Sequence, residues 1–162
     1  VDSVSGGNVT RYAYPIDPVN SVDLDGRQVV YDKYKLFQCY RYNYVCKAKR
    51  AAHVVTVGTV AMGGAKKAGG TCERILGMFV CYGLPSWYIL AQRAGTTYGN
   101  AFITHLLKSE ITAPMMSHEK EHRHQWYIFG HWFPELYLKE GVDPCQNYFE
   151  QKAGLENGNY DC

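Results

Sequence analysis

The sequence lacks three features that would assign it to a common functional class. Its 162 residues carry a formal net charge of only +2, too small an excess to favour a nucleic-acid partner. No two of its six cysteines form a C-x-x-C pair, the spacing typical of small structural zinc sites. The stretch Gly63-Gly64-Ala65-Lys66-Lys67 lacks the full G-x-x-x-x-G-K-[ST] spacing of a phosphate-binding loop, so we interpret it as a flexible turn.

A long uninterrupted hydrophobic run is also missing. Residues 75–91 contain no charged side chain and approach the length of a membrane-spanning helix, but Pro85 and two glycines interrupt them. We therefore expect a buried core segment rather than a membrane segment. Within residues 72–92 we expect a hairpin of helices, or one helix followed by a bend at Pro85.

The composition fits one globular domain of an exported protein. Hydrophobic residues make up 46% of the chain and charged residues 20%, which is enough apolar material to bury a core. Six cysteines are unusual for a reducing cytosol and favour disulfide bonds. The candidates are Cys39, Cys46, Cys72, Cys81, Cys145 and Cys162, and because six cysteines allow many connectivities, their pairing stays open.

The segment that suggests chemistry is His118-Glu119-Lys120-Glu121-His122, which reads H-E-x-x-H. On a helix, residues four apart lie on one face, so His118 and His122 can bind one Zn²⁺ ion with Glu119 beside them. Zinc lowers the pKa of a bound water, and a neighbouring carboxylate can take its proton. We therefore predict an active-site helix around residues 114–130. The predicted reaction is metal-assisted hydrolysis of a protein or peptide, with Glu119 as the general base.

The same residues also satisfy the inverted motif H-x-x-E-H, in which Glu121 would be the base. We favour Glu119 because the Gln125-Trp126 pair and a downstream glutamate match the ordinary order of the motif. A stretch rich in histidine and glutamate can also be a polar helix face without a metal. The aromatic and leucine side chains at near-helical spacing between residues 126 and 137 are expected to form the core behind the site.

Two histidines leave zinc one protein ligand short, because catalytic sites usually have three protein ligands and one open position. The downstream candidates are His124, His131, Glu135, Glu140, Asp143, Glu150 and Glu156. His124 follows His122 by two residues, so on a helix it points away from the metal face. Glu150 is favoured because residues 147–154 are expected to form a second helix, which a loop containing glycine and proline returns to the site.

Three further segments are predicted less uniquely. Residues 96–104 are β-prone, and an open strand edge can pair with an extended peptide, so we expect Gly99, Asn100 and Ala101 to bind substrate. An ordinary sheet strand is the alternative. Residues 27–45, rich in tyrosine, predict one or two short strands or an aromatic cover. Residues 53–68 fit either a helix or a strand that leads into a glycine turn.

The N-terminal region resembles a known family. Tyr12-x-Tyr14, followed by D-P-V-N-x-V-D-L-D-G at residues 17–26, resembles the conserved end of the Rhs/YD-repeat core, the shell that encloses a variable C-terminal toxin in bacterial polymorphic toxins. The resemblance implies that residues 1–26 end this core and residues 27–162 form a secreted or delivered effector with a cognate immunity protein. In that family the core cleaves itself near this motif, whereas Val1 lies upstream of it, so we expect a piece of a longer protein.

A second resemblance covers residues 98–160. The pattern H-E-x-x-H-x-x-Q-W followed by N-x-F-E-x-x-A-G-L-x-x-G-x-Y resembles the gluzincin arrangement of predicted bacterial metallopeptidases. It implies a zincin-like α+β fold, with helices and a small mixed or antiparallel sheet, and Glu150 as the third zinc ligand. Many relatives have Asp where this chain has Gly154, a position that supports the histidines from behind.

We therefore predict a secreted effector that acts as a zinc-dependent metallopeptidase, without a nucleic-acid or membrane partner. Two alternatives remain open. A metal-dependent nuclease would use the histidines with the basic residues 41–50 on phosphates. A non-catalytic, disulfide-stabilised domain would act by binding or on membranes through residues 75–91.

Overall fold

The computed structural model describes residues 31–40, 42–91 and 93–162. In chain order, these residues form the helices and strands η3 (Asp32–Phe37), α1 (Tyr44–Lys67), β1 (Thr71–Ile75), β2 (Met78–Tyr82), η4 (Ile89–Ala91), β3 (Thr96–Tyr98), β4 (Ala101–Ile103), η5 (Lys108–Glu110), α2 (Ala113–Phe129), η6 (Gly130–Trp132), α3 (Phe133–Lys139) and α4 (Tyr148–Ala153). The motif that resembles the end of an Rhs core, together with the predicted boundary at residue 26, lies outside these described residues.

The strands form one four-stranded mixed sheet in the order β1-β2-β4-β3. β1 and β2 pair antiparallel, β2 and β4 pair parallel, and β3 and β4 pair antiparallel. With the helices, this sheet makes the domain an α+β structure, which confirms the predicted fold class and its small mixed sheet. β3 forms one edge of the sheet and β1 forms the other.

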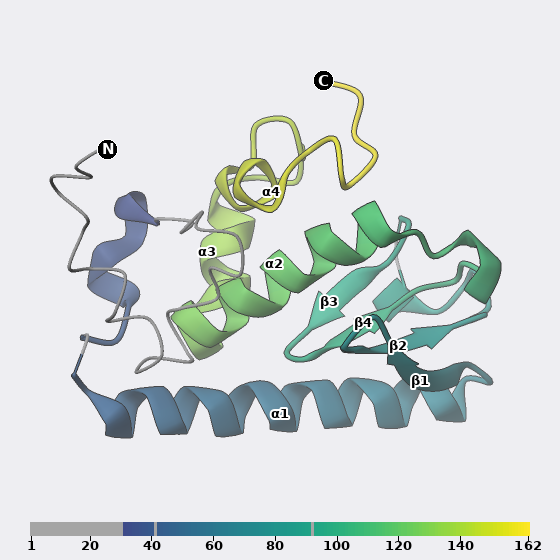
Figure 1. Cartoon of the computed structure of the whole chain (residues 1–162), viewed down its shortest axis with the longest axis horizontal. Helices are drawn as coiled ribbons and strands as arrows, with labels where there is room; N and C mark the ends of the chain where they lie inside the picture. Colours follow the sequence, from purple (N-terminus) through teal and green to yellow (C-terminus); the bar gives the residue numbers. More distant parts are fainter. Residues whose placement is uncertain (1–30, 41, 92) are drawn as a thin grey trace, which may run out of the picture.

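The sheet lies between the two long helices, as Figure 1 shows. Successive side chains of a strand point to opposite faces, and the buried residues separate accordingly. On one face, Cys81, Ala101 and Ile103 pack with Ala61 and Ala65 of α1. On the other face, Met78, Val80 and Phe102 pack with Met116 of α2. The sheet therefore fixes the N-terminal half of α2, where the H-E-x-x-H motif lies, relative to α1.

A second core, rich in aromatic rings, joins the C-terminal half of α2 to α3, α4 and η3. Its buried members are Tyr31, Tyr34, Val54, Trp126, Ile128, Phe129, Phe133, Leu136 and Phe149. Phe149 of α4 is fully buried and packs edge-on against Phe129 and Phe133. The predicted packing role of residues 126–137 is confirmed for Trp126, Phe129, Phe133 and Leu136, whereas Trp132 is 38% exposed.

The prediction of helices within residues 72–92 is wrong, because most of this segment is a β-hairpin. β1 and β2 are joined by Leu76 and Gly77, which both have positive φ (47° and 84°), the backbone that a two-residue hairpin turn requires. The buried residues of β2 face both long helices, so the strand has no simple polar–apolar alternation. Within the described part of the chain, no helix is long and apolar enough to cross a membrane.

Three other predicted segments can be compared with the structure. Among residues 31–40 and 42–45 no strand occurs, and the chain forms η3, a loop and the start of α1. Residues 53–67 belong to α1, which confirms the helical alternative for this segment. The interpretation of residues 63–67 as a flexible turn is wrong, because they form the last turn of this helix. The strand predicted over residues 96–104 is instead the hairpin β3–β4, which turns at Gly99 and Asn100.

All six cysteines are paired, as Cys39–Cys46, Cys72–Cys81 and Cys145–Cys162. This resolves the connectivity that the sequence left open. The first disulfide joins the loop after η3 to α1, and the second lies across β1 and β2. The third joins the loop before α4 to the segment after it. Three disulfides in so short a chain are typical of proteins from oxidising environments.

Candidate metal site

Helix α2 carries the H-E-x-x-H motif and matches its predicted position to within a residue. Its first turn is capped by the Thr112 side chain, which accepts a hydrogen bond from Met115 N. It ends before Gly130, which has a φ of 60° that favours glycine. The helix places His118, His122 and Gln125, at spacings of four and three residues, on the face that points towards α4.

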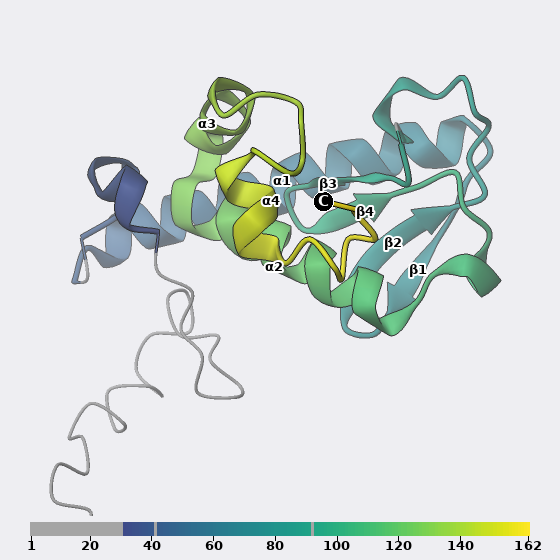
Figure 2. The ribbon, with the colours of Figure 1, turned by 90° about the horizontal axis from the view of Figure 1, so that it is seen from above.

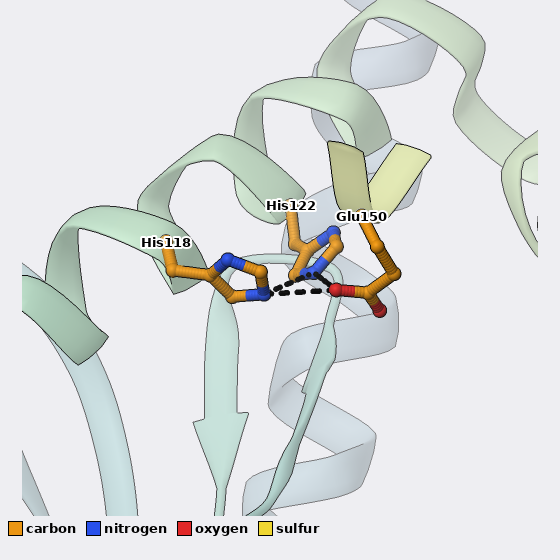
Figure 3. Close-up of side chains that lie close together, drawn as sticks. All are labelled: His118, His122 and Glu150. Carbon is orange, nitrogen blue, oxygen red and sulfur yellow. Dashed lines mark hydrogen bonds and ion pairs between the residues drawn. The ribbon is translucent and has the colours of Figure 1, made fainter. Parts of the chain in front are cut away.

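Three side chains from α2 and α4 converge on one point. The Nε2 atoms of His118 and His122 lie 3.0 Å apart, and Glu150 Oε2 lies 3.0 Å from the first and 3.3 Å from the second (Figure 3). Tetrahedral ligands with bonds of about 2.0–2.1 Å are about 3.4 Å apart, close to these distances. The three side chains are 2%, 7% and 3% exposed, so the structure contains a buried group that can hold a metal ion.

Helix α4 places Glu150 through its N-terminal cap. The Asn147 side-chain oxygen accepts hydrogen bonds from Phe149 N and Glu150 N. The amide nitrogen of the same side chain donates to the carbonyls of Tyr137 and Gly141, which ties the helix start to the end of α3. Phe149 anchors α4 in the aromatic core beside α2, and Glu150 points at the two histidines (Figure 3).

Hydrogen bonds behind the two imidazoles determine which nitrogen carries the proton. His118 Nδ1 lies 3.0 Å from the Gly154 carbonyl, an acceptor only, so Nδ1 must donate. His122 Nδ1 lies 2.8 Å from Gln125 Oε1, and the Gln125 amide is oriented by its own donation to the Phe149 carbonyl. Nε2 is therefore the nitrogen that each ring presents to Glu150. This is the arrangement of metal-binding histidines, in which a backbone carbonyl at Gly154 provides the support.

The electrostatics of the group favour a cation. Burial alone would lower the pKa of His122, but the neighbouring carboxylates of Glu150 and Glu119 raise it to about 9. Burial would raise the pKa of Glu150, but hydrogen bonds from His118, His122 and Tyr137 hold it well below its usual range. Glu150 is therefore a carboxylate throughout the physiological pH range, the form that binds metals.

The two glutamates of the motif have different surroundings. Glu119 is buried and accepts a hydrogen bond of 2.6 Å from the Thr97 hydroxyl on β3. Its charge acts on both His122 and Tyr160, so it lies within electrostatic range of the metal group. Glu121 instead accepts a hydrogen bond from the buried Tyr31 hydroxyl and pairs with His124 at 3.3 Å. Its contacts are structural.

The remaining candidates for the third ligand lie elsewhere. His124 pairs with Glu121, as expected for a residue that points away from the metal face. His131 is exposed beside His53, and Glu140 pairs with Lys33. Asp143 accepts a hydrogen bond from Cys145 N. Glu135 and Glu156 are exposed.

The three residues predicted to bind substrate do not lie on the open edge of the sheet. Gly99 and Asn100 form the β3–β4 turn against α1, where a Cβ on Gly99 would lie 2.2 Å from the Val54 carbonyl oxygen. Ala101 is fully buried in β4, an inner strand. The edge belongs to β3, residues 96–98. There, the Thr97 carbonyl already accepts a hydrogen bond from the Trp126 indole.

Several residues near the group were not predicted from the sequence. Tyr137 donates its hydroxyl hydrogen bond to Glu150 Oε1, and Thr97 holds Glu119. Tyr160 packs its ring against His118 with a centroid distance of 5.7 Å. Burial, followed by the charges of Glu150 and Glu119, raises the pKa of Tyr160 to about 12. In the sequence, Tyr160 appears only as the last residue of the gluzincin-like pattern. No sequence pattern around Thr97 or Tyr137 indicates a role at the site.

The site thus combines two imidazoles whose Nε2 atoms face an ionised carboxylate at Glu150 and a second buried carboxyl group at Glu119. Such a set can bind a divalent metal and provide a proton acceptor beside it. Comparisons with protein-family models, curated proteins and solved structures find no match to this chain.

Proposed function

We propose that this chain is a zinc-dependent metallopeptidase that acts as a secreted effector. The observation that carries the proposal is the convergence of His118, His122 and Glu150 from two helices onto one point, with the buried carboxylate of Glu119 on the same helix.

The donor set favours zinc over other divalent metals. Two imidazole nitrogens and one carboxylate oxygen are a three-ligand set of intermediate softness, typical of catalytic zinc. Magnesium and calcium instead prefer oxygen ligands only. A zinc ion held there would act as a Lewis acid that acidifies water and polarises a peptide carbonyl. The carbonyl of Gly154 and the side chain of Gln125 hold the imidazoles in the tautomer that this role requires.

Glu119 is the proposed general base. Its carboxylate is buried at 8% exposure, so a proton that it accepts from the attacking water is kept out of bulk solvent and can pass to the departing amine. Thr97 orients this carboxylate from β3 through the 2.6 Å hydrogen bond. Glu121 is not assigned this role, because its Oε1 atom accepts a hydrogen bond from Tyr31 and pairs with His124.

The proposed delivery of this effector rests on residues outside the metal site. The motif at residues 17–26 supports an Rhs-type shell upstream, and with it a cognate immunity protein as partner. The three disulfides support passage through an oxidising compartment. A peptide or protein is the substrate class in this proposal, because metal-assisted attack on a carbonyl is the reaction that the residues suit.

The test is peptide cleavage by Glu119→Gln, which keeps the shape of the side chain and removes the base. We expect the zinc-loaded wild type to cleave a mixed peptide library and the variant to lose about 10²–10⁴-fold in rate with unchanged zinc content. Glu121→Gln is the matched control and should keep most of its activity. Cleavage that survives in Glu119→Gln, or that is lost only in Glu121→Gln, would contradict the assignment.

A further inference from the structure

The segment after α4, residues 155–162, lies directly against the metal site. Figures 1 and 2 show it leaving α4 and running alongside α2, and Figure 1 shows it then turning away from α2 to the C-terminus. The contact is close: a Cβ added at Gly158 would lie 2.8 Å from His118 Cε1 and 2.7 Å from the Tyr160 ring. The Tyr160 ring itself packs edge-on against His118. The backbone at residue 158 and the phenol of Tyr160 thus cover one metal-binding imidazole.

The segment also restricts access to the group. A catalytic metal needs one position open to substrate, yet His118, His122 and Glu150 are nearly inaccessible to solvent. Tyr160 packs against His118 and lies within electrostatic range of both Glu150 and the proposed base, Glu119. An extended peptide can reach both carboxylates only if the segment that carries Tyr160 moves.

The segment is held by few contacts beyond its own residues. Its backbone hydrogen bonds are local: Gly158 N to Gly154, Asn159 N to Glu156 and Tyr160 N to Leu155. Arg93 hydrogen-bonds the Tyr160 hydroxyl from the loop before β3. The covalent attachment is the disulfide between Cys145 and Cys162. Segments with this contact pattern open at low free-energy cost once their tether is removed.

Glu150 does not depend on that tether. The Asn147 cap and the buried Phe149 ring hold α4 in place, and both lie within the domain core rather than in the covering segment. Breaking the disulfide therefore frees residues 155–162 while leaving the three metal-binding side chains where they are.

We propose that residues 155–162 form a cap over the metal site that the Cys145–Cys162 disulfide locks and that a thiol reductant releases. The inference rests on the proposed metal site and adds its regulation. A reductant thiolate attacks one sulfur, and the other leaves as a thiolate that takes up a proton. A second reductant thiol then resolves the mixed disulfide, giving two cysteine thiols and one reductant disulfide. The enzyme is closed in an oxidising compartment and opens in a reducing cytosol.

The test measures access to the site by zinc itself. Zinc association with the metal-free chain and zinc release to a chromogenic chelator are followed by stopped flow for the wild type and for the Cys145→Ser/Cys162→Ser variant. Cys39→Ser/Cys46→Ser is the matched control, because that disulfide joins the loop after η3 to α1, away from the covering segment. Tyr160→Ala, with all disulfides intact, removes the covering ring alone. Thermal unfolding verifies that each variant is folded.

A cap predicts that association and release both accelerate, by about 10-fold or more, in the Cys145/Cys162 variant and in Tyr160→Ala, but not in the control. The equilibrium dissociation constant should stay within about threefold, far from the ~10–100-fold loss that follows removal of a supporting contact. An unchanged association rate in the Cys145/Cys162 variant would overturn the cap. Failure of the wild type to bind zinc at all would instead overturn the metal site and the proposed function with it.

Discussion

The side-chain oxygen of Gln125 lies 2.8 Å from Nδ1 of His122. The amide nitrogen of the same residue donates to the Phe149 carbonyl at 2.8 Å, and Gln125 is fully buried. One side chain therefore fixes the tautomer of a candidate metal ligand and joins α2 to the helix that carries Glu150.

Gln125→Leu should weaken zinc binding by about 10–100-fold, because it removes the acceptor that holds His122 in its binding tautomer. The measurement is competition against a chelator of known affinity at fixed pH. Gln146→Leu, at an exposed position before α4, is the control and should leave affinity unchanged. Equal affinities in wild type and Gln125→Leu would show that the contact does not support the site.

Thr97 should act on catalysis and not on metal binding. Its hydroxyl hydrogen-bonds Glu119, which is not one of the three candidate metal ligands. Thr97→Val is expected to lower kcat for peptide cleavage by between about 10- and 100-fold by misplacing the base, with zinc affinity unchanged. Thr97→Ser should restore the rate, since it restores the hydroxyl. Loss of zinc in Thr97→Val, or failure of the serine variant to recover, would point to a structural role.

Glu140 should make stability depend on pH. Burial would raise the pKa of its carboxyl, but Lys33, at 2.6 Å, and the Tyr34 hydroxyl hold it below the ordinary value. A lowered folded-state pKa means that the stabilisation is present above the unfolded pKa and is lost as pH falls through the folded one. Glu140→Gln should therefore destabilise the chain by about 1 kcal/mol at neutral pH.

Urea unfolding of wild type and Glu140→Gln between neutral and acidic pH measures this effect. The difference between their free energies of unfolding should shrink as the pH falls below about 4. The exposed Glu135 lies on α3, the helix that Glu140 follows, and provides the control variant Glu135→Gln. A difference that stays constant across the pH range would mean that the Glu140 carboxylate does not stabilise η3 against α3.

Part of this site followed from local sequence rules. The spacing of His118 and His122 is a property of any helix, so α2 and the histidine pair were predictable to within a residue. Glu150, 28 residues after His122, was predicted from the resemblance to the gluzincin pattern and from the helix expected over residues 147–154, which the structure contains as α4. Thr97 and Tyr137 were not predictable, because their roles depend on how β3 and α3 pack against α2 and on no pattern within their own segments.

The hairpin at residues 71–82 shows where periodicity misleads. Met78 and Val80 face α2, whereas Cys81 faces α1, so β2 is buried from both sides and reads as a continuous apolar run. Because residues 75–91 contain no charged residue to mark a solvent face, this part of the chain resembled a buried helix. The turn at Leu76-Gly77 was the available signal for a hairpin, because glycine tolerates the positive φ found there.

Metal content of the purified chain is the most direct test of the His118, His122 and Glu150 site. We predict one zinc ion per chain by elemental analysis after dialysis against metal-free buffer. His118→Ala and Glu150→Ala should lose it, whereas the control His131→Ala, at an exposed position, should retain it. A folded wild-type chain that binds no zinc, or a His118→Ala chain that still holds a full equivalent, would contradict the site and the proposed activity.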